Sequence, residues 1–462
     1  MEKSIIFIGG GPAGYEGAIR AAMLGAKVTI IEKEDVGGTC LNRGCIPTKA
    51  LYKNAEVLKD IKNAEEFGYK IDNYSIDFEK IMERKDNVVS KLRDGILMIL
   101  KSYNIDLIYG NASFIDEKIL LVKTIDKSFE ISADIIIIAT GSSPIIPKVD
   151  GVELGGVITS RELLSLKAIP KTLTIAGGGV IGLEFANIFN ELGTEVTIIS
   201  NALLKRVDKE LSKRVTMMVK KQGIKFLAKS HLEKIEESEN GLKIYTTNEK
   251  NKVVDSDLLL LAMGRVANFE GLNIENAHIK FDRKGIIVDD DFKTSTEGIY
   301  AVGDVIGKKM LAHVASNQAI YLVEKLLDGK SHIDLETVPD CVFISPEVAT
   351  VGMTEEECKE SNIEYSKNKF LFGANGKALA LNEPDGFVKV LAEKTTNKIL
   401  GVHIMGPHAS DLIMEGTLAI SNNFSASDIG KTIHPHPTLS ESFLEASLGI
   451  VDEAIHRVKS KR

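Results

Sequence analysis

The sequence predicts an α/β protein with two doubly wound (Rossmann-like) nucleotide-binding domains and a separate C-terminal α+β domain. A strand, a glycine turn and a helix begin near residue 5, and the same pattern recurs near residue 172. Beyond about residue 340 the pattern changes to short strands, turns and helices. The chain has 462 residues, which suits about three or four domains of roughly 100–200 residues each.

The first repeat contains a complete dinucleotide-binding pattern. Apolar residues 5–8 lead into a Gly-x-Gly-x-x-Gly motif at 9–14, and an Ala-rich helix is expected over 15–24. The glycines allow a tight turn and let backbone N–H groups at the helix N-terminus approach a pyrophosphate. A second strand over 27–31 ends at Glu32, whose carboxylate can bind a ribose. A glycine turn without a ligand is the alternative. The candidate residues are Gly9, Gly11, Gly14 and Glu32.

The second repeat places every glycine 168 residues after its counterpart, from Gly9 to Gly177. A strand over 172–176 precedes the motif, and a helix to Leu192 and a strand over 195–199 follow it. Two such folds in one chain imply two nucleotides, and therefore transfer between two cofactors. The candidate residues for the second nucleotide are Gly177, Gly179 and Gly182.

The two repeats differ where a ribose would be recognised. The position equivalent to Glu32 is Ser200, and Lys205 and Arg206 follow shortly after it. Loss of the carboxylate removes a group that favours a free 2′-hydroxyl and repels a 2′-phosphate. Two interpretations stay open. The corner either recognises a 2′-phosphate, or Ser200 bonds the ribose while both cations are solvated.

The segments outside the two repeats also carry clear patterns. An amphipathic helix is expected over 78–100, and buried strands are expected over 135–139 and 258–262. In the C-terminal part, residues 387–391 and 399–405 have the alternation of antiparallel strands. The two buried strands end at turns that contain Thr140, Gly141, Gly264 and Arg265.

The two cysteines of the segment 37–49 are the most specific short feature. Cys40 and Cys45 are five positions apart, so on an ideal helix their Cα atoms would be roughly 8–9 Å apart. This exceeds the limit of about 7 Å for a disulfide, so a bridge requires a distorted turn, which Gly44 would permit. A zinc site would need a second pair of ligands, and two inert thiols are the remaining alternative.

Composition excludes several classes of protein. The 57 basic and 65 acidic residues give a net charge of −8, which argues against nucleic-acid binding. The longest apolar runs, 135–139 and 258–262, are too short to cross a bilayer, so no membrane is expected. Four cysteines do not make a secreted disulfide scaffold. Residues Met1–Ser4 precede only four apolar residues, so we expect no signal peptide and a cytoplasmic location.

The order of the motifs resembles a known family, the flavoprotein pyridine nucleotide-disulfide oxidoreductases of class I, over essentially the whole chain. The resemblance rests on the two glycine motifs with Glu32 and Glu184, Gly-Gly-Thr-Cys-x₄-Cys-Ile-Pro-Thr-Lys at 37–49, Ala-Thr-Gly at 139–141, Thr-Glu-Gly-Ile-Tyr-Ala-Val-Gly-Asp at 296–304, Ser-Pro-Glu-Val-Ala at 345–349 and Ile-His-Pro-His-Pro-Thr-Leu-Ser-Glu at 433–441.

The resemblance implies FAD on the first glycine motif and NAD or NADP on the second. It implies that Cys40 and Cys45 form a redox disulfide against the flavin, and that Lys49 and Glu184 form an ion pair near the flavin N5. A cation there would stabilise negative charge that develops on the ring. The remaining positions that it assigns to cofactor binding are Thr140, Gly141, Gly264, Asp304 and Ala312, besides Ser200.

The resemblance also implies a homodimer whose active site crosses the interface. Thiol–disulfide exchange needs a base, because the thiolate is the nucleophile. In this family the C-terminal His-Pro-Thr run supplies the base from the partner subunit, which indicates His436, with Glu441 orienting its imidazole. The pair His434 and His436 lacks a third ligand, so we expect no metal site.

Within the family the sequence is most similar to the dihydrolipoamide dehydrogenases. The last cysteine is Cys358, so the additional C-terminal cysteine pair of high-molecular-weight thioredoxin reductases and mercuric reductases is missing. Val180 stands where glutathione reductases place a tyrosine. The implied reaction is oxidation of protein-bound dihydrolipoyl groups, and the implied partners are lipoyl-bearing proteins of 2-oxoacid dehydrogenase or glycine-cleavage systems. An NADPH-dependent reductase of a small disulfide, similar to glutathione reductase, and a catalytically idle redox sensor are the alternatives.

Some positions depart from the family pattern. Ser200 replaces the usual acid, Lys377 a more common arginine and Gln318 a common glutamate, while Cys341 and Cys358 are interpreted as buried or incidental thiols. We expect an FAD-binding domain over 1–145, an NAD(P)-binding domain over 146–266, a central segment over 267–337 that completes the FAD site, and an interface (dimerisation) domain over 338–462.

Overall fold

A computed structural model describes residues 3–239 and 241–458, so the expectation made on Met1 and Glu2 lies outside it. Its first unit is built on a parallel sheet with the strand order β18-β7-β1-β2-β3. The strands are β1 (Ser4–Ile8), β2 (Lys27–Glu32), β3 (Asp106–Tyr109), β7 (Ile135–Ile138) and β18 (Ile299–Ala301). Because helices cover such a sheet on both faces, its strands are almost continuously apolar.

The second unit repeats the first. Its parallel sheet has the order β9-β16-β10-β11-β12, which places β10 and β11 as β1 and β2 are placed in the first sheet. The strands are β9 (Val157–Ile158), β10 (Thr172–Ala176), β11 (Glu195–Ser200), β12 (Lys225–Ala228) and β16 (Leu258–Leu261). The predicted pair of Rossmann-like folds is therefore confirmed.

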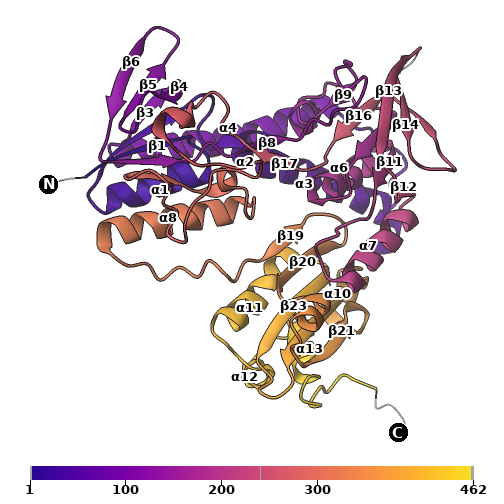
Figure 1. Cartoon of the computed structure of the whole chain (residues 1–462). Helices are drawn as coiled ribbons and strands as arrows, with labels where there is room; N and C mark the ends of the chain where they lie inside the picture. The colour runs from indigo at the N-terminus through magenta and orange to yellow at the C-terminus, as the bar shows by residue number, and fades with distance from the viewer. Residues whose placement is uncertain (1–2, 240, 459–462) are drawn as a thin grey trace.

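Helices bring distant segments together around these sheets. Helix α1 (Pro12–Met23) follows the first glycine turn and packs against α8 (Ala312–Asp328), which lies beside it in Figure 1. Helix α6 (Val180–Glu191) follows the second turn and packs against α3 (Cys45–Lys62). The contact between α3 and α6 thus joins the cysteine segment to the second repeat.

The C-terminal unit is the predicted α+β domain. Its antiparallel sheet has the order β19-β20-β23-β22-β21. The strands are β19 (Asp340–Val342), β20 (Glu347–Gly352), β21 (Tyr365–Leu371), β22 (Phe387–Glu393) and β23 (Ile399–Gly406). The helices of this unit are α9 (Glu355–Glu360), α10 (Gly376–Ala380), α11 (Ala409–Ser421), α12 (Ala426–Gly430) and α13 (Glu441–Leu448). In Figure 1 this orange and yellow unit stands apart from the first sheet.

Smaller elements complete the chain. The long predicted helix is α4 (Phe78–Ser102), whose N-terminus is capped by Asp77. The others are α2 (Gly38–Arg43), α5 (Ser160–Leu163), α7 (Lys209–Lys221), β4 (Asn111–Phe114), β5 (Ile119–Lys123), β6 (Ser128–Ser132), β8 (Ser142–Pro144), β13 (Leu232–Ser238), β14 (Gly241–Thr246), β15 (Val253–Ser256) and β17 (Arg265–Ala267). Within residues 3–239 and 241–458, no helix combines the length and apolar character needed to cross a bilayer.

Candidate active site

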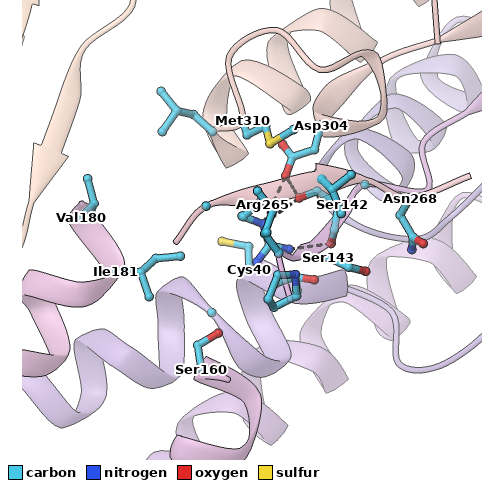
Figure 2. Close-up of a pocket in the computed structure, with 18 of the residues that line it drawn as sticks. Cys40, Ser142, Ser143, Ser160, Val180, Ile181, Arg265, Asn268, Asp304 and Met310 are labelled. Atoms are coloured by element: carbon cyan, nitrogen blue, oxygen red, sulfur yellow. Dashed lines mark hydrogen bonds and ion pairs between the residues drawn. The ribbon is translucent and has the colours of Figure 1, made fainter. Parts of the chain in front are cut away.

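One cavity of about 1520 Å³ joins the two glycine turns, and Figure 2 shows part of its lining. Both repeats, the cysteine segment and the start of β19 contribute to it. The sequence-predicted residues in the lining are Gly9, Gly11, Glu32, Cys40, Cys45, Lys49, Thr140, Gly141, Gly177, Gly179, Glu184, Ser200, Gly264, Asp304 and Ala312. Gly14 and Gly182 lie outside the lining, and so do His436 and Glu441.

The glycine turns are packed too closely for larger residues. Gly9 has φ +107°, and a Cβ on Gly14 would lie 1.8 Å from the Gly9 carbonyl oxygen. In the second repeat Gly177 has φ +131°, and a Cβ on Gly182 would lie 2.3 Å from the Gly177 oxygen. Each helix is thereby held against its strand with its N-terminal N–H groups toward the cavity, as phosphate binding requires.

The ends of the two second strands carry different groups. The buried Glu32 carboxylate accepts hydrogen bonds from the N–H groups of Gly10 at 2.7 Å and Glu34 at 2.8 Å. Ser200 instead donates its hydroxyl to the Ala202 carbonyl at 3.1 Å. The first nucleotide site therefore has a fixed carboxylate, and the second has a neutral hydroxyl.

The two cysteines lie on consecutive short helices with a break between them. Helix α2 ends at Arg43 and α3 begins at Cys45. At the break, a Cβ on Gly44 would lie 2.8 Å from the Thr39 carbonyl oxygen, so the close approach requires glycine. The distorted turn predicted at Gly44 is thus confirmed, and both thiols line the cavity, close enough for each to shift the pKa of the other.

The pKa values of the two thiols are shifted in opposite directions. Both cysteines are present as free thiols. The hydrogen bond from Cys40 and the charge of Lys49 lower the pKa of Cys45, although burial opposes this. The same hydrogen bond, together with burial, raises the pKa of Cys40. Of the two thiols, Cys45 is therefore the one that ionises more readily.

Lys49 and Glu184 form a partly buried ion pair beside the thiols. The Lys49 ammonium lies 2.9 Å from both carboxylate oxygens of Glu184 and 4.2 Å from the centre of the Phe343 ring. Glu184 also accepts a hydrogen bond from the Phe343 N–H at 3.1 Å. Burial raises the pKa of Glu184, and the Lys49 charge opposes that shift. This contact joins α3 of the first unit to α6 of the second.

A polar cluster that the sequence analysis did not assign surrounds Asp304. The Arg265 guanidinium donates to the Ser142 hydroxyl at 2.7 Å and to its carbonyl at 2.6 Å, and the same hydroxyl donates to Asp304 (Figure 2). Burial lowers the pKa of Arg265. The pairing of β8 with β17 brings Ser142 and Arg265 together. The sequence analysis placed Arg265 in the turn after a buried strand, but it gave no indication that Arg265 contacts Ser142.

Two further groups prepare this wall of the cavity. The Thr140 hydroxyl oxygen is buried and has no hydrogen-bond partner among the described residues, as expected for a group that serves a ligand. Gln318, left unexplained by the sequence, accepts a hydrogen bond from the Gly303 N–H at 2.8 Å and so holds the turn before Asp304. The glycine cradles, Glu32 and Thr140 fit a bound dinucleotide.

His436 and Glu441 form a pair outside the cavity. The imidazole Nδ1 lies 2.8 Å from a Glu441 oxygen, and the other Glu441 oxygen accepts from the Thr438 N–H at 2.8 Å. The His436 side chain is 79% exposed in the single chain. His434 is instead nearly buried, between the Thr432 carbonyl and Glu415. Among the described residues, no cluster of three or more His, Cys, Asp or Glu side chains has the arrangement of a metal site.

The remaining cysteines differ in position. Cys358 is buried in α9, whereas Cys341 lines the cavity, and burial raises the pKa of its thiol to about 12. Cys341 is therefore a neutral thiol at physiological pH.

The chain belongs to the pyridine nucleotide-disulphide oxidoreductase family. The model of this family matches residues 3–319, and the model of its dimerisation domain matches residues 338–447. The chain is thus an oxidoreductase of a family that uses FAD and NAD(P), as the resemblance implied.

Curated relatives match over nearly their full length. The chain is 40% identical to a dihydrolipoyl dehydrogenase of Chlamydia pneumoniae over 99% of this chain and 98% of that protein. It is 40% identical to one of Bacillus subtilis over 98% and 99%, and 38% identical to a mitochondrial one of Pisum sativum over 98% and 93%.

Solved structures have the same fold. The HOCl-induced flavoprotein disulfide reductase RclA from Escherichia coli has a TM-score of 0.87 at 30% identity, covering 96% of this chain and 99% of that one. LpdA from Mycobacterium tuberculosis has a TM-score of 0.91 at 27% identity, covering 97% and 99%. The predicted fold class is therefore confirmed over the 96–97% of the chain that these structures cover.

Proposed function

We propose that this chain is an FAD-dependent dihydrolipoyl dehydrogenase that oxidises protein-bound dihydrolipoyl groups and reduces NAD(P)+. The observation that carries the proposal is that the neighbouring cysteines Cys40 and Cys45 both line a cavity shared by two dinucleotide turns. The curated relatives of that name support the substrate. The proposal includes the four-part division at 1–145, 146–266, 267–337 and 338–462, a cytoplasmic location, and lipoyl-bearing proteins of 2-oxoacid dehydrogenase or glycine-cleavage systems as partners.

The acidities of the two thiols assign their roles in the exchange. A dihydrolipoyl thiolate attacks Sγ of Cys40 in the oxidised pair, the Cys40–Cys45 bond breaks, and the electron pair leaves on Cys45. Cys45 is the better leaving group because its pKa is lowered. The second substrate thiol then attacks the substrate sulfur of the mixed disulfide. The lipoyl ring closes, and Cys40 leaves and takes a proton.

A base must accept the proton of the substrate thiol, and His436 suits this task. Its Nδ1 is bound to Glu441, which leaves Nε2 free to accept a proton and stabilises the imidazolium that results. His436 lies outside the cavity that holds the thiols of its own chain. We therefore assign the base to His436 of the partner subunit in a homodimer, consistent with the dimerisation domain at residues 338–447.

The cofactor sites follow the two repeats. Bound FAD would supply the two-electron chemistry that links the dithiol to hydride transfer to the nicotinamide coenzyme. The first glycine turn and Glu32 would hold its adenosine and pyrophosphate, and Thr140, Asp304 and Lys49 would line the rest of the site. The second turn, with Gly177, Gly179 and Gly182, would hold the coenzyme.

The test is steady-state reduction of NAD+ and NADP+ by dihydrolipoamide on the flavin-loaded protein. Cys45→Ser should abolish turnover while flavin content is unchanged, and Cys358→Ala, outside the cavity, should retain it. If the protein shows no turnover with dihydrolipoamide but reduces glutathione disulfide, the proposal is wrong and the alternative, an NADPH-dependent reductase of a small disulfide, takes its place.

The shared active site is tested by mixing two inactive variants. In a hybrid dimer of Cys45→Ser and His436→Gln subunits, one site combines an intact cysteine pair with an intact histidine. Random reassortment should therefore restore roughly a quarter of wild-type turnover. No gain above the parents, with hybrid dimers shown by native mass spectrometry, would place the base in the same chain.

A further inference from the structure

The two repeats, which would bind flavin and coenzyme, are called here the flavin half and the coenzyme half. The flavin half has a carboxylate, Glu32, at the end of β2, and the coenzyme half has none at the end of β11, where Ser200 stands. In the flavin half, Glu32 is fixed against the glycine turn by the Gly10 N–H. In the coenzyme half, Ser200 lies in the same place, since a Cβ on Gly178 would be 2.9 Å from its Oγ. A 2′-phosphate at this corner would meet a neutral hydroxyl instead of a negative charge.

The segment that follows β11 is folded back over the glycine turn. The Leu204 N–H donates to the Gly178 carbonyl at 2.9 Å. At its far end Asp208 caps α7 and is bound by the buried ammonium of Lys389 at 3.0 Å. The loop after β12 lies against the segment, because the Lys229 N–H donates to the Asn201 carbonyl at 3.3 Å. Residues between Ser200 and Asp208 are thus held at the cavity.

This segment carries two exposed cations, Lys205 and Arg206, and both line the cavity. Within residues 3–239 and 241–458, neither forms an ion pair within 4.0 Å. Asp340 is the acid that feels the charge of Arg206, and it also faces Lys309 and His313. Among the described residues, Lys205 and Arg206 therefore have no directly paired carboxylate, and Asp340 shares its charge with Lys309 and His313 as well as Arg206.

We propose that Ser200, Lys205 and Arg206 bind the 2′-phosphate of the coenzyme, so that this chain uses NADP(H) in preference to NAD(H). A phosphate dianion accepts charge-assisted hydrogen bonds from guanidinium and ammonium groups, and the Ser200 hydroxyl can rotate from the Ala202 carbonyl to donate to it. This inference rests on the proposed function, in which dihydrolipoyl groups donate the electrons, but it concerns only the site that binds the coenzyme.

Binding of nucleotide fragments tests this subsite without turnover. Calorimetry on the flavin-loaded dimer should show adenosine 2′,5′-bisphosphate binding roughly 10- to 100-fold more tightly than 5′-AMP, as one or two charge-assisted hydrogen bonds predict. In Lys205→Gln/Arg206→Gln this preference should disappear. The matched control is Lys213→Gln/Arg214→Gln, because these exposed cations of α7 lie outside the cavity and their loss changes the net charge equally.

Kinetics provide the second readout. The wild-type kcat/KM for NADP+ should exceed that for NAD+, and Ser200→Glu should lower the NADP+ value by about tenfold or more while the NAD+ value is kept. Equal binding of both fragments to the wild type, or equal loss in the control pair, would overturn the inference. Fragment preference without dihydrolipoamide turnover would support it and reject the proposed substrate instead.

Discussion

At the scale of single residues, Lys49 connects the ion pair of the site to the acidity of the thiols. Its charge contributes to the lowered pKa of Cys45. Lys49→Met should therefore raise the pKa of Cys45, and alkylation of Cys45 at neutral pH should slow by up to roughly tenfold because less of the thiol is ionised. The measurement is the pH profile of iodoacetamide labelling of the reduced protein, resolved by peptide mass spectrometry.

The control for Lys49 is Lys53, one turn further along α3. Its side chain is 59% exposed, and its ammonium pairs with Glu56 at 3.2 Å. Lys53→Met removes the same charge from the same helix but should leave the labelling profile of Cys45 in place. An unchanged profile in Lys49→Met would show that the hydrogen bond from Cys40 alone sets the acidity.

Gln318 is a second residue whose role a single contact defines. The Gly303 N–H that it binds is buried, so Gln318→Leu should cost about 1–3 kcal/mol of unfolding free energy through the unsatisfied donor. Chemical denaturation measures the cost. Gln318→Glu keeps an acceptor oxygen and should retain most of the wild-type stability, whereas equal stability of Gln318→Leu and the wild type would contradict the account.

At the scale of elements, the break between α2 and α3 sets how close the two thiols lie. A methyl group at Gly44 would collide with the Thr39 carbonyl oxygen at 2.8 Å. Gly44→Ala should therefore separate Cys40 from Cys45 and slow their oxidation by oxidised glutathione, measured as the mass loss on disulfide formation. Gly95→Ala in α4 is the control, since a Cβ added at Gly95 would have no atom within 4 Å. Equal oxidation rates in both variants would show that the break tolerates a side chain.

The same elements show what the sequence could predict. The glycine turns, the strands beside them and the pair at 40 and 45 depend on local spacing, and the structure has them within one or two residues of the predicted bounds. The cluster of Ser142, Arg265 and Asp304 depends on the pairing of β8 with β17, which are far apart in the chain. Such a contact leaves no periodic signal, so this cluster was not predicted, whereas the similarly distant pair of Lys49 and Glu184 was expected only because the family resemblance implied it.

At the scale of the whole molecule, a buried ionic network joins the coenzyme unit to the C-terminal unit. Lys389 of β22 is 2% exposed and binds Asp208 of the coenzyme unit at 3.0 Å, as well as Glu355. Glu355 also accepts from Lys367 at 2.9 Å. Removal of the shared cation by Lys389→Met would leave two carboxylates buried together, at a cost of about 3–5 kcal/mol.

The pH dependence of stability distinguishes this network from ordinary surface pairs. Burial alone would raise the pKa of Glu355, but hydrogen bonds from Lys389 and Lys367 lower it from 4.5 to about 2. A carboxyl with a lowered pKa in the folded state stabilises the protein above its unfolded pKa, and this stabilisation is lost as the pH falls from 4.5 toward 2. Urea unfolding across this range should show that loss in the wild type and a weaker one in Lys389→Met. The control is Lys394→Met. The Lys394 side chain is 60% exposed, so its ion pair with Glu364 contributes little to stability. Equal pH slopes in all three proteins would show that the network does not couple the two units.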